Sequence, residues 1–194
     1  MVKIAITGGI ACGKTLVGKI FRKKGIPVCE ADELGHELLR PDSAVFGEIV
    51  EAFGPGIVDE DGSISRKLLG NQVFADAGKL AQLNRITHPK IKSAWRAWQQ
   101  KHAQENSAVI VPLFFETGEK EGWDCAICVV CDESSQLTRL LERGLTELDA
   151  KRRVAALMPV DRKIAASDYV IVNNGTMDLL EQQTTRVLQS ILER

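Results

Sequence analysis

Hydrophobic positions along the chain form five short apolar runs, separated by longer segments with helical spacing. Each run is apolar almost throughout and does not alternate with polar residues, which is typical of strands covered on both faces. Such strands alternating with helices predict an α/β fold with a five-stranded parallel sheet. The predicted strands are Lys3–Thr7, Pro27–Ala31, Ala108–Val111, Cys125–Cys131 and Asp168–Val172.

The segment between the second and third runs has mainly helical spacing, and we interpret it as an insert over one sheet edge. Proline and glycine predict helix ends within it, and a new helix is expected to begin at Pro89. A second, charged insert is expected at residues 143–162. The breaks in the first insert fall at Arg40-Pro41, Phe53–Gly56 and His88-Pro89.

Composition narrows the class of protein. The 194 residues suit one α/β domain, and 44% hydrophobic with 26% charged residues are globular values. A formal net charge of −1 gives no reason to expect nucleic acid or a membrane surface as the main partner. We expect a cytoplasmic protein, because the chain opens directly on a strand pattern and carries no run of membrane-spanning length.

The five cysteines do not suggest a disulfide framework. Cys125 and Cys128 match C-x-x-C, but they lie in an apolar run, whereas a redox site of this kind needs an exposed helix start. We therefore expect buried, inert thiols in a reducing compartment.

Residues Gly8 to Thr15 match G-x-x-x-x-G-K-[ST] between a predicted strand and a predicted helix. Glycines allow the backbone to form a cradle of N–H groups, and the helix directs its positive end at phosphates. Lys14 would reach the β- and γ-phosphates of ATP, and the Thr15 hydroxyl would bind Mg²⁺. The expected fold is thus a three-layer α/β/α P-loop fold. Its candidate ATP-binding residues are Gly8, Gly9, Ile10, Ala11, Cys12, Gly13, Lys14, Thr15 and Leu16.

Cys12 supports a side hypothesis. A thiol at a helix N-terminus near Lys14 is expected to have a lowered pKa and to react readily with alkylating reagents. The alternative is a harmless replacement for serine.

Ligands of parallel sheets bind outside the carboxyl ends of the strands, and three acidic residues lie at such ends. Asp32 either takes the proton of a substrate hydroxyl or caps the following helix. Glu30 has the same two interpretations, with the structural one favoured. Glu116 closes the third strand, where a carboxylate reaches Mg²⁺ through water or binds the substrate.

Arg139 and Arg143 are spaced i, i+4 on the helix after the fourth strand, for which Ser134 and Ser135 offer an N-cap. The two arginines either clamp phosphates or form a solvated face. We expect a solvated helix face at Lys19, Arg22, Lys23 and Lys24. We expect lid or surface charges at Arg152, Arg153, Arg162 and Lys163.

Together these segments resemble the dephospho-coenzyme A kinase family along nearly the whole chain. The matching segments are Ile6–Ile10 with Gly13-Lys14, Ala31-Asp32, Leu83-Asn84 with Thr87–Pro89, Val111–Glu116, Gln136–Arg139 with Glu142-Arg143, and Ala166–Gly175.

The resemblance implies transfer of the ATP γ-phosphate to the ribose 3′-hydroxyl of dephospho-CoA. It also implies a nucleotide core (about 1–31, 104–142 and 163–194), a helical coenzyme A insert (about 32–103) and a lid (about 143–162). No nucleic acid or membrane partner is expected, and the enzyme is expected to be a monomer or small homo-oligomer.

The resemblance also assigns roles to single residues. It makes Asp32 the catalytic carboxylate, assisted by Lys14 and Arg139, and it places Arg139 and Arg143 near the lid. The turn at Asn173 matches the adenine side of the ATP site, through Asn174 and Gly175. The candidate substrate-binding residues are Asp32, His88, Pro89 and Glu116.

The sequence departs from the family pattern at Glu30, where Asp is usual, and at Ala11 and Cys12, where Gly and Ser are usual. Ala11 limits backbone freedom, but we expect the cradle to survive. The alternatives are another small-molecule P-loop kinase or a non-catalytic nucleotide-binding module. A GTP switch would need Asn-Lys-x-Asp, which the sequence lacks.

Overall fold

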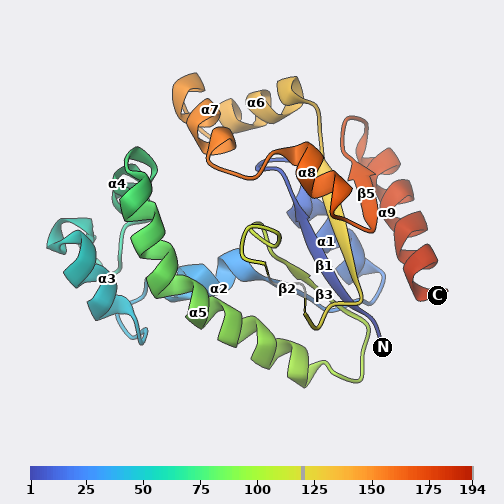
Figure 1. Ribbon diagram of the computed structural model, residues 1–194, viewed down its shortest axis with the longest axis horizontal. Helices are drawn as coiled ribbons and strands as arrows, with labels where there is room; N and C mark the ends of the chain where they lie inside the picture. Colours follow the sequence, from blue (N-terminus) through green and yellow to red (C-terminus); the bar gives the residue numbers. More distant parts are fainter. Residues whose placement is uncertain (119–120, 194) are drawn as a thin grey trace. The chain divides into compact units, whose positions relative to one another are not determined.

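The computed structural model describes residues 1–118 and 121–193 and contains a five-stranded sheet (Figure 1). The strand order is β2-β3-β1-β4-β5, and every neighbouring pair is parallel. The predicted α/β fold with five parallel strands is therefore confirmed. The strands are β1 (Lys3–Gly8), β2 (Val28–Glu30), β3 (Ser107–Ile110), β4 (Cys125–Val130) and β5 (Tyr169–Val172).

The register brings the carboxyl ends of the strands to one edge of the sheet. Ile6 of β1 lies opposite Ile110 of β3 and Ile127 of β4. Both β3 and β4 are buried at every position, which explains their continuous apolar sequence. The segments that follow β1, β3, β4 and β5 therefore start close together.

Two helices pack against each other beside this sheet, α1 (Lys14–Lys23) and α9 (Met177–Leu192). Their buried residues, such as Phe21 and Leu180, share one apolar core with Ile4, Ile127 and Ile171 of the sheet. Three helices follow β4 and belong to the same unit: α6 (Glu133–Glu142), α7 (Glu147–Ala155) and α8 (Val160–Ala165).

The chain divides into two units, one of residues Met1–Glu30 with Gln99–Arg194, and one of Ala31–Trp98. The second unit has a core of its own, which includes Ile49, Ile57 and Leu69. It contains α2 (Ala31–Glu37), α3 (Phe46–Phe53), the short 3₁₀ helix η1 (Pro55–Ile57), α4 (Arg66–Ala75) and most of α5 (Ala77–Lys101).

The predicted helix end at His88-Pro89 is wrong, because α5 continues through Pro89. A proline inside a helix removes one backbone hydrogen bond and disturbs the preceding turn. On either side of Pro89 the helix packs through apolar residues, Ile86 against the core of the second unit and Trp95 as a buried side chain. This packing outweighs the single lost bond.

Two predicted caps are also corrected. Helix α2 begins at Ala31, so Asp32 lies in its first turn and not at the N-cap. The N-cap of α6 is Asp132 instead of Ser134 or Ser135, and its side chain accepts the Ser135 N–H at 2.7 Å. Hydrogen bonds from Ser134 and then Ser135 hold the pKa of the Asp132 carboxyl well below its usual range.

Across the described residues, helices fall short of the length and apolar content needed to cross a membrane.

Candidate active site

The loop between β1 and α1 depends on two glycines. Gly8 has φ 137°, and a Cβ there would lie 2.0 Å from the carbonyl oxygen of Val129. Gly13 has φ 102°, and its Cβ would lie 2.3 Å from Nδ2 of Asn173. Both positions combine a left-handed backbone with a contact that a side chain would block, so only glycine fits.

Ala11 takes the position where the family usually has glycine. It is the single residue other than glycine with positive φ in the described ranges, at 57°. This conformation costs about 1–2 kcal/mol for a residue with a Cβ. The methyl group is buried with Leu140 and Ala150, and this packing offsets part of the cost.

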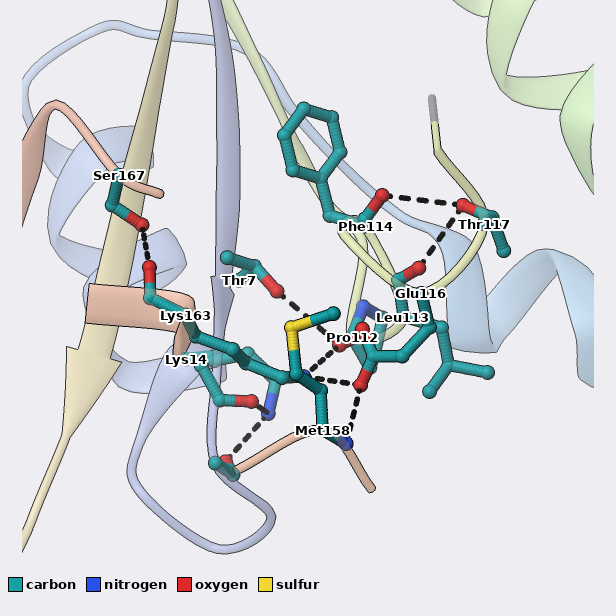
Figure 2. A network of polar contacts seen from close by, with 12 residues as sticks. Thr7, Lys14, Pro112, Leu113, Phe114, Glu116, Thr117, Met158, Lys163 and Ser167 are labelled. Carbon is teal, nitrogen blue, oxygen red and sulfur yellow. Dashed lines mark hydrogen bonds and ion pairs between the residues drawn. The ribbon is translucent and has the colours of Figure 1, made fainter. Parts of the chain in front are cut away.

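Helix α1 offers its first amides to an anion. Its N-cap is Gly13, which has no side chain to accept from those amides, and its first turn carries no acidic residue. The Lys14 ammonium donates to the carbonyls of Gly9 at 2.8 Å and Gly8 at 3.3 Å (Figure 2). Positive charge and helix N-terminus therefore meet at one loop, as phosphate binding requires.

Thr15 in the first turn of α1 and Arg22 in its last turn both contact Glu30 at the end of β2. The Thr15 hydroxyl lies 3.3 Å from Oε2 of Glu30, and Arg22 binds Oε1 of the same carboxylate at 3.0 Å. Arg22 also donates to the carbonyl of Val28 at 3.0 Å, and its side chain stays 39% exposed, in agreement with the predicted solvated helix face. The side chain bridges α1 and β2 because Glu30 ends the neighbouring strand.

The side chains of Thr15 and Glu30 show whether this site suits Mg²⁺. No group of three or more metal-binding His, Cys, Asp or Glu side chains occurs within residues 1–118 and 121–193. Mg²⁺ held by a nucleotide needs few protein ligands, since phosphates and waters fill most of its coordination sphere. A Thr15 hydroxyl with Glu30 behind it supplies oxygen donors of the right kind, and these residues fit the ion.

Three side chains from distant segments hold the backbone of the phosphate-binding loop. Arg139 donates to the carbonyls of Ala11 at 3.3 Å and Asn173 at 2.9 Å. Asn173 donates to the Cys12 carbonyl at 2.9 Å, and Gln136 donates to Ile10 at 2.8 Å. Neither contact was predicted, because Gln136 carries no local motif and Asn173 was expected only in a turn.

The two predicted arginines have different surroundings. Arg139 lies half-buried against the loop, whereas Arg143 is the exposed C-cap residue of α6. Among the described residues, the Arg143 side chain has no hydrogen-bond partner. Arg139 therefore contacts the loop, and the role of Arg143 stays a prediction.

The predicted adenine-side turn follows β5 next to the start of α6. Oδ1 of Asn174 accepts the Asp132 N–H at 2.9 Å. A Cβ on Gly175 would lie 2.7 Å from Cδ2 of Leu179, so the turn packs tightly on α9.

The sulfur atoms of Cys12 and Cys131 lie 3.3 Å apart. Cys12 is only 1% exposed, which contradicts the expected ready reaction with alkylating reagents. Burial, followed by the contact with Cys12, raises the pKa of the Cys131 thiol to about 12. Burial raises the pKa of Cys128 to about 11, in agreement with the inert strand predicted for Cys125 to Cys131.

Glu116 and Lys163 form an ion pair beside the loop. Nζ of Lys163 lies 2.7 Å from Oε1 of Glu116, and the lysine side chain is 1% exposed (Figure 2). The prediction that Lys163 is an exposed lid or surface charge is therefore wrong, because its side chain is buried. This burial could not be predicted, because Lys163 lies in a charged stretch and Glu116 lies far away along the chain.

The remaining candidates belong to the second unit, namely Asp32, His88 and Pro89. Their approach to the phosphate-binding loop stays a prediction. Burial lowers the pKa of the His88 imidazole. Burial and then Arg66 lower the pKa of His36, four residues after Asp32.

Comparisons with known proteins agree with this geometry. The sequence profile of the dephospho-CoA kinase family matches residues 2–178. A dephospho-CoA kinase of Shouchella clausii is 39% identical over 180 residues, which is 91% of each chain.

Solved structures extend the likeness to three dimensions. A Thermus thermophilus structure matches with a TM-score of 0.80 at 27% identity, covering 97% of both chains. The dephospho-CoA kinase from Campylobacter jejuni matches with a TM-score of 0.70 at 27% identity, covering 97% of this chain and 96% of the other. The chain belongs to the dephospho-CoA kinase family.

Proposed function

We propose that this protein transfers the γ-phosphate of ATP to the ribose 3′-hydroxyl of dephospho-CoA, giving coenzyme A and ADP. The observation that carries the proposal is the loop at the carboxyl end of β1. There the Lys14 ammonium, the uncapped start of α1 and the Thr15 hydroxyl come together in a member of the dephospho-CoA kinase family.

On the nucleotide side, the amides of Gly8 to Leu16 bind the phosphates of ATP, with Lys14 as the charged partner of the β- and γ-phosphates. Arg139 and Arg143 offset charge that develops in the transition state. Asn174 and Gly175 contact the adenine. Thr15, with Glu30 next to it, would hold Mg²⁺, which would neutralise phosphate charge when bound.

On the acceptor side, Asp32 takes the proton of the 3′-hydroxyl and orients its oxygen toward the γ-phosphate. His88, Pro89 and Glu116 contact dephospho-CoA. Residues 32–103 form the coenzyme A insert, and residues 143–162 act as a lid that excludes water from the transfer. We propose that the enzyme works in the cytoplasm as a monomer or small homo-oligomer.

A substrate panel tests the proposal. Coupled detection of ADP release should show turnover with dephospho-CoA and a rate at least about a hundredfold lower with nucleosides, nucleotides and water alone. Turnover on a nucleoside or nucleotide in place of dephospho-CoA would contradict it. Equal ATP binding and equal background activity for the wild type and Asp32→Ala would instead indicate a non-catalytic module.

A further inference from the structure

The ion pair of Glu116 and Lys163 joins two segments that flank the phosphate-binding loop. Glu116 lies in the loop that follows β3, and Lys163 lies in α8, after the proposed lid. Figure 2 shows the two side chains directed toward each other, with Pro112 and Met158 next to them. A lysine is rarely buried so completely, and the pairing compensates the loss of hydration.

The Lys163 ammonium has a second partner in the same loop. It donates to the carbonyl of Pro112 at 3.0 Å, and the Thr7 hydroxyl donates to that carbonyl at 3.2 Å. Thr7 belongs to β1, directly before the phosphate-binding loop. The position of Pro112 is thereby fixed from both β1 and α8.

Only one oxygen of Glu116 is used by these contacts. Oε1 faces Nζ of Lys163 and accepts the Met158 N–H at 3.1 Å. Within the described parts of the chain, Oε2 has no hydrogen-bond donor. The side chain of Glu116 is 22% exposed, so Oε2 can meet a ligand from solvent.

We propose that Lys163 is a positioning residue for the acceptor substrate. Its ammonium holds Oε1 of Glu116 and the Pro112 carbonyl, and it thereby presents Oε2 of Glu116 to a hydroxyl or N–H group of dephospho-CoA. This inference rests on the proposed function, in which Glu116 contacts that substrate. Lys163 itself touches the loop and not the ligand.

Steady-state kinetics with both substrates tests the inference. Lys163→Met and Glu116→Gln should each raise KM for dephospho-CoA about tenfold or more, because each removes a charged hydrogen-bond partner. KM for ATP and the Kd of a fluorescent ATP analogue should stay within about twofold of wild type, since the loop contacts of Lys14 are unchanged. Lys163→Arg should give a KM closer to wild type than Lys163→Met.

The double variant Lys163→Met/Glu116→Gln separates positioning from folding. It leaves no unpaired buried charge, so its Tm should recover relative to Glu116→Gln, which leaves the buried Lys163 ammonium without its carboxylate, while KM for dephospho-CoA stays raised. Lys163→Met leaves only the partly exposed Glu116 carboxylate, so its KM can be measured even if Glu116→Gln does not fold. Glu105→Gln is the matched control, because Glu105 is exposed and pairs with His102 at 3.1 Å outside the proposed site and lid.

Distinct outcomes overturn the inference. If KM for dephospho-CoA returned to the wild-type value together with Tm in the double variant, the ion pair of Glu116 and Lys163 would have a structural role only. A KM unchanged in Glu116→Gln, or equal losses for both substrates, would also contradict it. A wild-type chain that leaves dephospho-CoA unmodified would contradict the proposed function itself, and the inference with it.

Discussion

The side-chain amide of Asn173 donates a 2.9 Å hydrogen bond to the backbone carbonyl of Cys12, across 161 residues of sequence. The bond fixes the end of β5 to the middle of the phosphate-binding loop. Arg139 completes the link by donating to the carbonyls of Asn173 and Ala11. Side chains from the segments that follow β4 and β5 therefore hold the backbone of the phosphate-binding loop in place.

Replacing Arg139 with methionine should destabilise the fold and weaken ATP binding. The change removes two charged hydrogen bonds to half-buried carbonyls, so we expect a loss of about 2 kcal/mol in the free energy of unfolding. Urea unfolding and the Kd of an ATP analogue measure the two effects.

Arg143→Met provides the comparison, because its side chain is exposed. It should leave the free energy of unfolding unchanged and lower kcat alone if this arginine clamps phosphates. An Arg139→Met protein as stable as wild type would contradict the structural role of that residue.

Gly13→Ala should abolish high-affinity ATP binding. The added Cβ would lie 2.3 Å from Nδ2 of Asn173 in a backbone conformation that alanine rarely adopts. Isothermal titration with ATP checks this, with Gly47→Ala as control because a Cβ there meets nothing within 4 Å. Equal affinity for the Gly13→Ala protein and wild type would refute the argument.

Glu30→Gln should raise the Mg²⁺ concentration needed for half-maximal activity. The carboxylate stands behind the Thr15 hydroxyl, and partners of metal ligands typically contribute about tenfold or more to metal affinity. A Mg²⁺ titration at saturating ATP gives the value. Glu105→Gln, which alters an exposed pair with His102, should leave it unchanged. Identical Mg²⁺ curves for Glu30→Gln and wild type would count against a role near the metal.

Cys128 and Cys131 should resist alkylation in the folded protein. Their pKa values of about 11 and about 12 lie above the ordinary value of 9.0, so both stay protonated between pH 7 and 9. Folding favours the protonated thiols, and their stabilising contribution is full below about pH 9 and is lost as pH rises through 11 to 12. Mass spectrometry after iodoacetamide treatment, with and without urea, measures this protection. Rapid labelling of the native chain would contradict it.

His88 should titrate below its usual pKa of 6.5, because burial disfavours the imidazolium. A lowered pKa means that its contribution to stability is present above pH 6.5 and is lost as pH falls through the folded-state value. NMR of the imidazole gives the pKa directly. Urea unfolding between pH 7 and 5 should show a smaller loss for His88→Gln than for wild type.

The sheet could be predicted because the inner strands are buried and their apolar runs are continuous, as in Cys125–Val130. The edge strands β2 and β5 are only partly buried, but their sequences are also largely apolar. The helix through Pro89 could not, because its continuation depends on packing on either side of the proline. Ser134 and Ser135 were the predicted caps of the helix after β4, whereas Asp132 accepts the Ser135 N–H in the structure.

For the site, the phosphate-binding loop could be predicted because one short segment supplies glycines, lysine and threonine together. The residues that hold this loop lie far along the chain and form no motif with it. Gln136 and Asn173 reach it only because β1, β4 and β5 end at the same edge. Lys163 was misassigned for the same reason, since its burial comes from Glu116 and Pro112 in another segment.

The most direct test of the account mixes the purified chain with Mg·ATP and dephospho-CoA and identifies the products by mass spectrometry and ³¹P NMR. We expect ADP and coenzyme A in equal amounts, with a new phosphate monoester on the ribose 3′-oxygen, and a loss of at least about a thousandfold in turnover for Asp32→Asn with ATP binding retained. ATP hydrolysis without coenzyme A, or phosphate transferred to another atom, would contradict the account.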